Sequence, residues 1–454
     1  MTQIPARILL RARRFAAGLI LAILAGAAPA GAVPAFAVQT GQPCQMCHVG
    51  GFGPQLTPFG RNFKLHGYTQ RTTPFSIPLS AVAIASYVAT AKDQPPPPTH
   101  GFATNDNAAL DQASLIFAGG FGEHLGAFAQ ATYDGVARAF HWDNLDVRAT
   151  TTATLAGQDA VLGLSLNNSP SVEDAWNTTP AWGFPYTTST LAPTPSTQPL
   201  INGALAQTSL GLTGYAWVDS SVYLEAGAYG SPGAASLRRL GVDPANPGDI
   251  SGLAPYGRVA WQKMFGASAL EVGAFGLQAA IRPGLDRSTG LLDRYTDLGL
   301  DASYQAPLAH GDLFAVNARY THERQSLKAS CALALGGPPG GCARGELNDL
   351  RADVSYSWRG WLGGTLAAFD TSGTANPVLL AANRTGKPDS TGVLLQLDAT
   401  PFGGRSQPAR RANLRVGLQY VLYTRFDGAG IDFDGAGRRA SDNNTLRLFT
   451  WLAF

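Results

Sequence analysis

Residues 349–358 read Asp-Leu-Arg-Ala-Asp-Val-Ser-Tyr-Ser-Trp, so every odd position is charged or polar and every even position is apolar. Alternation with a period of two is typical of a β-strand whose two faces meet different surroundings. Charged residues occupy one face here, while leucine, valine and aromatic residues occupy the other. We therefore interpret this stretch as a strand with one face in lipid and the other in a polar lumen.

The same pattern repeats from about residue 77 to the end of the chain, in segments of about ten residues that are separated by turns. We count sixteen segments, which begin near residues 78, 110, 124, 143, 160, 204, 221, 254, 268, 295, 312, 346, 361, 390, 412 and 443. The connections are alternately short, as at 218–220, and long, as at 168–203. This predicts an all-β fold, a 16-stranded antiparallel transmembrane β-barrel with both chain ends on the short-turn, periplasmic side.

The composition agrees with a barrel. Charged residues make up only 14% of the chain, hydrophobic residues make up 45%, and there are 53 glycines. A soluble β-sandwich or propeller would carry more charge, so we disfavour that alternative. The formal net charge of +2 gives no reason to expect nucleic acid as a partner.

The tryptophans suggest where the membrane interface lies. Trp217, Trp358, Trp361 and Trp451 all lie beside expected short turns or near the end of the chain. Aromatic residues collect at the interfaces of outer-membrane barrels, so we expect these four to form such a girdle.

The N-terminus has the pattern of a secretory signal peptide. Arg7 to Arg14 form a positive region, and residues 15–30 form an apolar, alanine-rich run. Sites with small residues end at Ala32 and at Ala37, and we favour cleavage after Ala37. A single transmembrane helix is the alternative, but the apolar run is short for one. An exported chain that forms a barrel is predicted to lie in the outer membrane of a Gram-negative bacterium, where the lipid of that membrane is its partner.

Residues 44–48 read Cys-Gln-Met-Cys-His, and C-x-x-C-H is the attachment motif for c-type haem. Each thiol adds to one vinyl group of the porphyrin, and the adjacent histidine reaches the iron as proximal ligand. A redox pair would call for a βαβ context. A zinc site would call for a second ligand pair, and only His66 is nearby. We therefore predict one covalent haem c on Cys44 and Cys47, with its iron on His48.

The rest of the haem environment is less well defined by the sequence. His66 is a candidate sixth ligand or a surface histidine, and Lys64, Tyr68, a lumenal side chain or an open position are alternatives. Arg61 and Lys64 are candidates to contact the propionates, although either side chain can equally be solvated. The candidates to cover the porphyrin are Phe52, Leu56, Phe59, Phe63 and Leu65.

Residues 38–76 form a segment too short to bury much of a core by itself. A haem and the barrel wall would have to supply apolar surface, and a sixteen-stranded barrel has room for a plug. We thus divide the chain into a signal peptide (1–37), a monohaem cytochrome c segment (38–76) that can plug the lumen, and a porin-like barrel (77–454).

A second cysteine pair lies far from the first. Cys331 and Cys342 are separated by ten residues inside an expected outer loop. In an oxidising compartment such a pair readily closes a short loop, so we predict a disulfide between them.

Both ends of the chain resemble the fused monohaem cytochrome–porin family of iron-oxidising bacteria. The N-terminal matches are Phe36-Ala37, Gln39-Thr40-Gly41, Cys44-x-x-Cys47-His48, Phe59-Gly60-Arg61, Phe63-Lys64 and Gly67-Tyr68. The C-terminal matches are Asp434-Gly435, Gly437-Arg438, residues 440–446 and residues 451–454. The middle strands match the family only in pattern. The resemblance implies a haem on Cys44, Cys47 and His48, extracellular Fe(II) as electron donor, and a periplasmic cytochrome as acceptor.

The main functional hypothesis is an outer-membrane electron-transfer cytochrome that passes electrons from an extracellular donor to a periplasmic acceptor. With Fe(II) as the donor, it would be an Fe(II)-oxidising protein. The alternatives are a diffusion porin with an accessory haem segment, a haem-based sensor, and electron transfer from a donor other than iron. The carboxylates expected to face the lumen either guide iron or form a structural charge ladder with arginines such as Arg351 and Arg415. They are Asp297, Asp301, Asp349 and Asp353.

Overall fold

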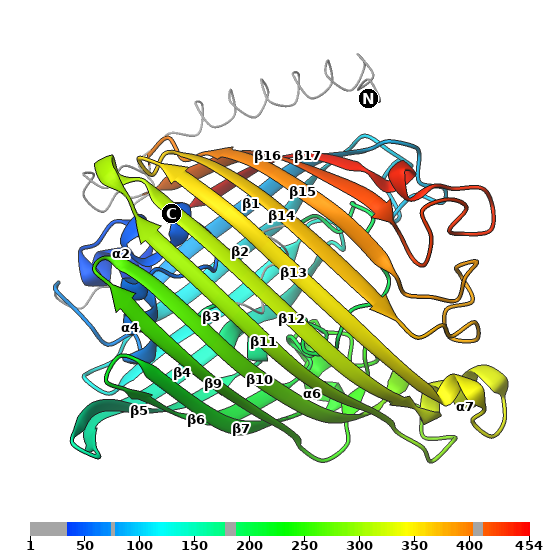
Figure 1. Ribbon diagram of the computed structural model, residues 1–454, viewed down its shortest axis with the longest axis horizontal. Helices are drawn as coiled ribbons and strands as arrows, with labels where there is room; N and C mark the ends of the chain where they lie inside the picture. Colours follow the sequence, from blue (N-terminus) through cyan, green and yellow to red (C-terminus); the bar gives the residue numbers. More distant parts are fainter. Residues whose placement is uncertain (1–33, 74–77, 178–187, 403–411) are drawn as a thin grey trace.

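The computed structural model describes residues 34–73, 78–177, 188–402 and 412–454. One antiparallel sheet of seventeen strands closes on itself where the first strand pairs with the last (Figure 1). One strand, β8 (Asp249–Ile250), has only two residues and pairs with the end of β10 (Ser268–Arg282). The barrel therefore has sixteen long strands. The prediction of a 16-stranded antiparallel barrel is confirmed.

The element bounds follow the sequence pattern closely. The long strands are Leu79–Thr90 (β1), Asn107–Gly120 (β2), Leu125–Asp134 (β3), Ala139–Leu155 (β4), Gln158–Asn167 (β5), Leu210–Val218 (β6), Val222–Gly230 (β7), Ala254–Phe265 (β9), Ser268–Arg282 (β10), Asp293–Pro307 (β11), Leu313–Leu327 (β12), Arg344–Trp358 (β13), Leu362–Gly373 (β14), Ser390–Ala399 (β15), Asn413–Arg425 (β16) and Thr445–Ala453 (β17). The α-helices are Ala35–Thr40 (α2), Cys44–Cys47 (α3), Pro58–Leu65 (α4), Pro170–Glu173 (α5), Ala234–Arg239 (α6) and Lys328–Leu335 (α7). None of the helices in the described ranges is both long and apolar enough to cross a bilayer.

The alternating pattern sorts side chains between the two faces of the wall. On β11, Leu298 and Leu300 are 60% and 62% exposed on the outside, whereas Asp297 and Asp301 are buried inside. Leaving so many leucines in water would be unfavourable, and a lipid bilayer removes that cost. The barrel thus has the fold and the apolar exterior of an outer-membrane protein, as the predicted localisation requires.

Glycine has a packing role on the lumenal face. A Cβ atom at Gly163 would come within 2.1 Å of the Tyr215 ring, and one at Gly299 within 2.1 Å of the Phe275 ring. Each aromatic ring therefore lies flat over the backbone of a glycine on the neighbouring strand. Such cross-strand pairs fix the register of the sheet, and they account for part of the high glycine content.

Most of the connections alternate in length as predicted, and the long loops lie at the end of the barrel where α7 is seen (Figure 1). Two predicted boundaries were wrong. The connection between β3 and β4 spans only residues 135–138, because Tyr133 and Phe140 pair across the strands with ring centroids 4.8 Å apart. Strand β6 begins at Leu210 rather than near residue 204, because residues before it turn inside the lumen.

The predicted tryptophan girdle was only half right. Trp358 and Trp361 are 37% and 40% exposed at the turn between β13 and β14. Trp217 and Trp451 are only 4% and 2% exposed, because they face the lumen and pack there against the N-terminal segment and its neighbours.

Residues 34–73, which we call the plug, lie inside the barrel at its short-turn end, where α2 and α4 are seen together with the C-terminus (Figure 1). The plug is tied to the wall on several sides. The Gln45 side chain donates to the carbonyl of Gly360 (2.6 Å), and the Gln305 side chain donates to the carbonyl of Leu56 (2.9 Å). Phe52 packs on Trp451 with ring centroids 5.4 Å apart.

A second insertion enters the lumen from the long-loop end. Residues 188–209, which we call the inner loop, pack Leu200, Ile201 and Leu205 against the wall strands. The backbone amides of Leu200 and Ile201 donate to the carboxylates of Glu323 (2.6 Å) and Asp297 (2.8 Å). The described part of the long predicted loop from residue 188 onward therefore folds into the barrel.

The expected signal peptide lies mostly outside the described residues, but the favoured cleavage site does not. Cleavage after Ala37 would cut through α2, where Phe36 stacks on Tyr68 and meets Phe63, each with ring centroids 5.0 Å apart. Ala35 also packs against Ile116 and Ala118 on β2. These contacts favour the alternative site, after Ala32.

We therefore predict that the mature chain begins at Val33, because Phe36 is part of the plug's packing. Intact-mass measurement of the protein purified from outer membranes, with N-terminal sequencing, checks this. A mature chain that begins at Val38 would contradict it and would mean that the plug packs without Phe36.

Candidate functional site

The cysteine pair occupies one turn of helix. Cys44 and Cys47 are the first and last residues of α3, so their side chains lie on one side of the helix, as residues three apart do. Neither forms a disulfide. The amide of His48 donates to the carbonyl of Cys44 (2.9 Å), so the imidazole follows directly from the turn that bears the thiols.

Helix α4 holds this turn in place from the other side. A Cβ atom at Gly60 would come within 2.2 Å of the Cys47 carbonyl oxygen, so only glycine permits this approach. Thr57 caps α4 by accepting from the amide of Gly60 (3.2 Å), and its own amide donates to the carbonyl of Cys47 (2.9 Å). The position of Cys47 is thus set by packing and by backbone bonds together.

His48 is in the form that a metal requires. Burial lowers the pKa of its imidazole to about 4, so the ring is neutral near pH 7, and neutral imidazole is the ligating form. The imidazole also has a hydrogen bond with the backbone of Gly53, which acts against the larger effect of burial on the pKa.

Two adjoining cavities flank the motif. One of about 140 Å³ is lined by residues that include Cys47, His48, Leu56 and Phe63. The other, of about 160 Å³, has both cysteines and His48 in its lining and extends to Trp451. Phe36 and Phe128 line both cavities. A mostly apolar space therefore lies next to both thiols and to the imidazole.

These features fit a c-type haem. The two thiols can form the thioethers, the neutral imidazole can ligate the iron, and the apolar walls can contact the porphyrin. Of the residues predicted to cover a porphyrin, Phe52, Leu56 and Phe63 line the cavities. Leu65 packs instead against Tyr215 and Trp217, and Phe59 is not among the lining residues.

His66 lies apart from this space. It follows the last residue of α4, its Nδ1 is 2.8 Å from the carbonyl oxygen of Asn62, and it is not among the lining residues of either cavity. Lys64, Tyr68, Asn144 and Asp174 do line the first cavity. The assignment of a sixth ligand to His66 stays a prediction, with no contact to His48 that supports it.

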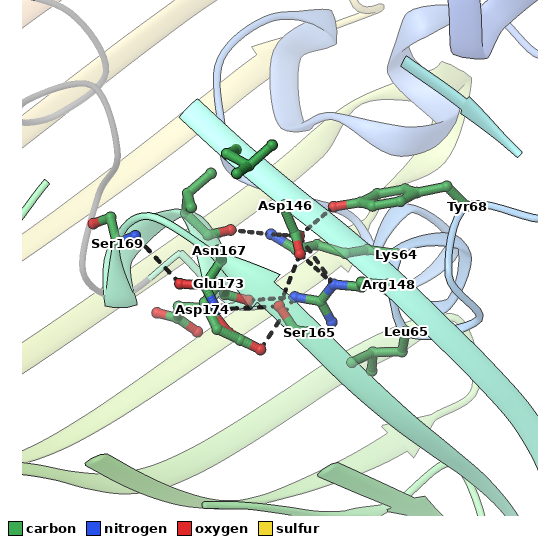
Figure 2. Close-up of polar contacts among 12 residues, drawn as sticks. Lys64, Leu65, Tyr68, Asp146, Arg148, Ser165, Asn167, Ser169, Glu173 and Asp174 are labelled. Carbon is green, nitrogen blue, oxygen red and sulfur yellow. Dashed lines mark hydrogen bonds and ion pairs between the residues drawn. The ribbon is translucent and has the colours of Figure 1, made fainter. Parts of the chain in front are cut away.

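A buried charge network anchors the plug to the wall (Figure 2). Asp146 on β4 accepts from the Tyr68 hydroxyl (2.6 Å) and forms ion pairs with Arg148 (2.9 Å) and Lys64 (3.5 Å). Arg148 in turn pairs with Glu173 of α5 (3.2 Å). Asp146, Arg148 and Glu173 are fully buried. The network thus joins the plug, the barrel wall and the segment that leads into the inner loop.

The two predicted propionate contacts have other partners in the structure. The Lys64 ammonium donates to the carbonyl of Val172 and pairs with Asp146, although the side chain also lines the first cavity. Arg61 donates to Gln262 (2.9 Å) and to the carbonyl of Leu56 (2.8 Å), and it is not among the residues that line either cavity. Lys64 remains beside the candidate haem space, whereas Arg61 bonds the plug to the wall.

The lumenal carboxylates have cationic or amide partners. Asp301 pairs with Arg258 (2.5 Å), and Asp349 pairs with Arg351 (3.0 Å) and with Arg319 (3.3 Å). Asp353 accepts from the Asn317 amide (3.0 Å), and Arg415 pairs with Asp398 (2.9 Å). Of the two readings of these side chains, the contacts favour a structural charge ladder over a path for iron.

The second cysteine pair is in the long-loop region. Cys331 on α7 and Cys342 form a disulfide in the structure, with Cα atoms 5.5 Å apart. It closes the loop between β12 and β13, far along the barrel from the plug (Figure 1).

The sequence did not identify the residues of the barrel wall that line the site. Phe128 on β3, Trp451 on β17 and Asn144 on β4 line the cavities although they lie far from the motif in sequence. Trp451 was assigned to the interface, yet it has the strand parity of the buried Phe449, and that parity was the available signal.

No family model and no curated protein matches the chain. Among solved structures, OmpF of Salmonella typhi in complex with daunomycin is similar over 83% of this chain and 97% of its own, with 13% identity and a TM-score of 0.51. OprB of Pseudomonas putida covers 83% of this chain and 93% of its own, with 10% identity and a TM-score of 0.49. An anion-selective porin from Comamonas acidovorans covers 83% and 98%, with 14% identity and a TM-score of 0.44. The likeness to OmpF shows a porin fold.

The buried network yields a test of how the plug is held. Asp146→Asn leaves Lys64 and Arg148 buried with one carboxylate fewer, so we expect a loss of about 3–5 kcal/mol in the free energy of unfolding. Urea titration in detergent, followed by tryptophan fluorescence, measures the loss. Asp159→Asn, an equal charge change at an exposed site on β5, serves as the control and should cost much less. Equal losses in the two variants would contradict the anchoring role.

Proposed function

We propose that this chain is an outer-membrane electron-transfer protein whose plug carries one c-type haem, bound through Cys44 and Cys47 and ligated by His48. One observation carries the proposal: the two thiols and the neutral imidazole lie beside the same mostly apolar space inside the barrel. Because the chain has a porin fold, this space lies within the cylinder that spans the membrane. The resemblance to the fused cytochrome–porin family supports the same assignment.

The position of the plug decides which route electrons would take. The apolar band of such barrels is about 25 Å tall, and the plug lies at the short-turn end of the lumen. The donor therefore has to enter from the long-loop end, while the acceptor approaches at the short-turn end, in the periplasm. A haem held there supplies a one-electron couple. Fe(II) is the proposed donor and a periplasmic cytochrome is the proposed acceptor.

The residues around the motif would act by positioning and by excluding water. Phe36, Phe52 and Phe63 give the space its apolar walls, and such walls keep a bound macrocycle away from solvent. Gly60 and Thr57 fix Cys47 and with it His48. Asp146 holds Lys64 and Tyr68, and so holds the helix that lies behind the cavity.

The second candidate is a diffusion porin, for which the porin fold itself is the favouring observation. In the described residues, however, both the plug and the inner loop occupy the lumen, and both are bonded to the wall. Solute flux through liposomes that carry the full chain, equal with and without the covalent haem, would support the porin function instead.

The two cysteine pairs provide a matched test of haem attachment. Cys44→Ala/Cys47→Ala removes both thioether positions, so we expect no covalent haem. Cys331→Ser/Cys342→Ser changes as many cysteines in an outer loop and should keep the haem at the wild-type level. Peroxidase staining on denaturing gels, with the pyridine haemochrome spectrum, measures both. Wild-type protein without a covalent haem stain, from cells able to mature cytochromes c, would contradict the proposal.

A further inference from the structure

A separate cavity lies in the lumen, away from the cysteine motif. It has a volume of about 410 Å³ and lies between the inner loop and strands β12 to β17. We call it the chamber. This size falls within the range of about 300–1,000 Å³ that is common for small-molecule sites. None of the residues that line the chamber lines the two cavities beside the cysteines.

The charged residues of the chamber are all cations. Arg319, Arg351 and Arg447 line it from β12, β13 and β17, and no aspartate or glutamate is among its lining residues. Arg447 forms an ion pair with Asp111 of β2 (2.9 Å), which offsets part of its charge. Arginine side chains bind carboxylates with two parallel hydrogen bonds, so a group of them favours anions with that geometry. A hydrated metal cation would be repelled by the same groups.

Two of the three arginines face each other across the sheet. Arg319 pairs directly with Arg351 in the antiparallel register of β12 and β13. Directly opposite side chains have Cβ atoms roughly 4.5–5.5 Å apart, and like charges there destabilise a sheet. Asp349 offsets this repulsion, because it contacts Arg319 (3.3 Å) and Arg351 (3.0 Å) at once. One carboxylate is thus shared between two guanidinium groups, and a bound anion would stabilise the pair further.

The rest of the chamber suits an organic anion. The inner loop contributes uncharged polar groups, among them Gln198, Ser189, which donates to Asp111 (2.6 Å), and Asn202, which donates to Asp349 (2.9 Å). The wall adds apolar and aromatic surface from Phe369 and Leu394, next to the guanidinium groups. A small inorganic anion would leave that surface uncovered, whereas a carbon skeleton that bears several carboxylates would contact both.

We propose that the chamber binds a small polycarboxylate anion, either free or as the ligand shell of a metal ion. The site depends on the arginines of the wall and on the inner loop, and not on a haem. It goes beyond the proposed electron transfer, to which it assigns no step.

Isothermal titration calorimetry of the purified full chain in detergent, with citrate as the probe, tests the proposal. We expect binding at one site that weakens at high salt. Arg351→Gln removes a charge-assisted contact and should weaken the affinity about ten- to a hundredfold. Arg282→Gln, the same change at an arginine that pairs with Asp249 outside the chamber, should bind citrate as the wild type does. Arg447→Gln, on another strand, repeats the loss if Arg351→Gln fails to fold.

Further titrations distinguish the ligand class and the source of any failure. Fe(II)–citrate separates the metal complex from the free anion, and inorganic phosphate tests the need for a carbon skeleton. Repeating the citrate titration on Cys44→Ala/Cys47→Ala separates this site from the haem proposal, because the affinity should not change. Absent citrate binding, equal binding by Arg351→Gln and Arg282→Gln, or phosphate binding as tight as citrate would each overturn the inference.

Discussion

The attachment of the plug to the barrel wall depends on the buried carboxylate of Asp146. It lies in the barrel wall without solvent exposure, and it meets the Lys64 ammonium, the Arg148 guanidinium and the Tyr68 hydroxyl together. A charge buried in this way is tolerated only when partners surround it, and removing one partner leaves the others uncompensated. Two of its four side-chain partners come from the plug, and the other two, Arg148 and Ser165, come from the wall, so this carboxylate joins the plug to the wall.

Because the plug is anchored in this way, the interior of the barrel differs from that of an open channel. The plug fills the short-turn end, and the inner loop occupies part of the other end, each held by hydrogen bonds to wall side chains. The cysteine motif is thereby held inside a cylinder whose outside is covered by apolar side chains. A redox group on those cysteines would therefore lie within the cylinder, at its short-turn end.

Much of the fold could be predicted, because a period of two is a local property of the sequence. The strand near Asp349 was found from its own ten residues, and the rest followed from the same pattern. Trp217 and Trp451 were wrongly assigned to the membrane interface because they lie near turns. The alternation of side chains along each strand instead puts them on the lumenal face. Leu212 and Leu224 face outward, whereas Trp217 shares the parity of the buried Thr213. The pairing of Lys64 with Asp146 depends on depth and register across 82 positions, which no local pattern specifies.

We propose that a haem inside the barrel takes electrons from the outer side of the membrane. The most direct measurement is the rate at which added Fe(II) reduces the haem, followed by difference absorbance, in intact cells and in lysed cells. We predict that the two rates agree, because the donor reaches the lumen from outside. Reduction only after lysis, or none in either case, would contradict the account.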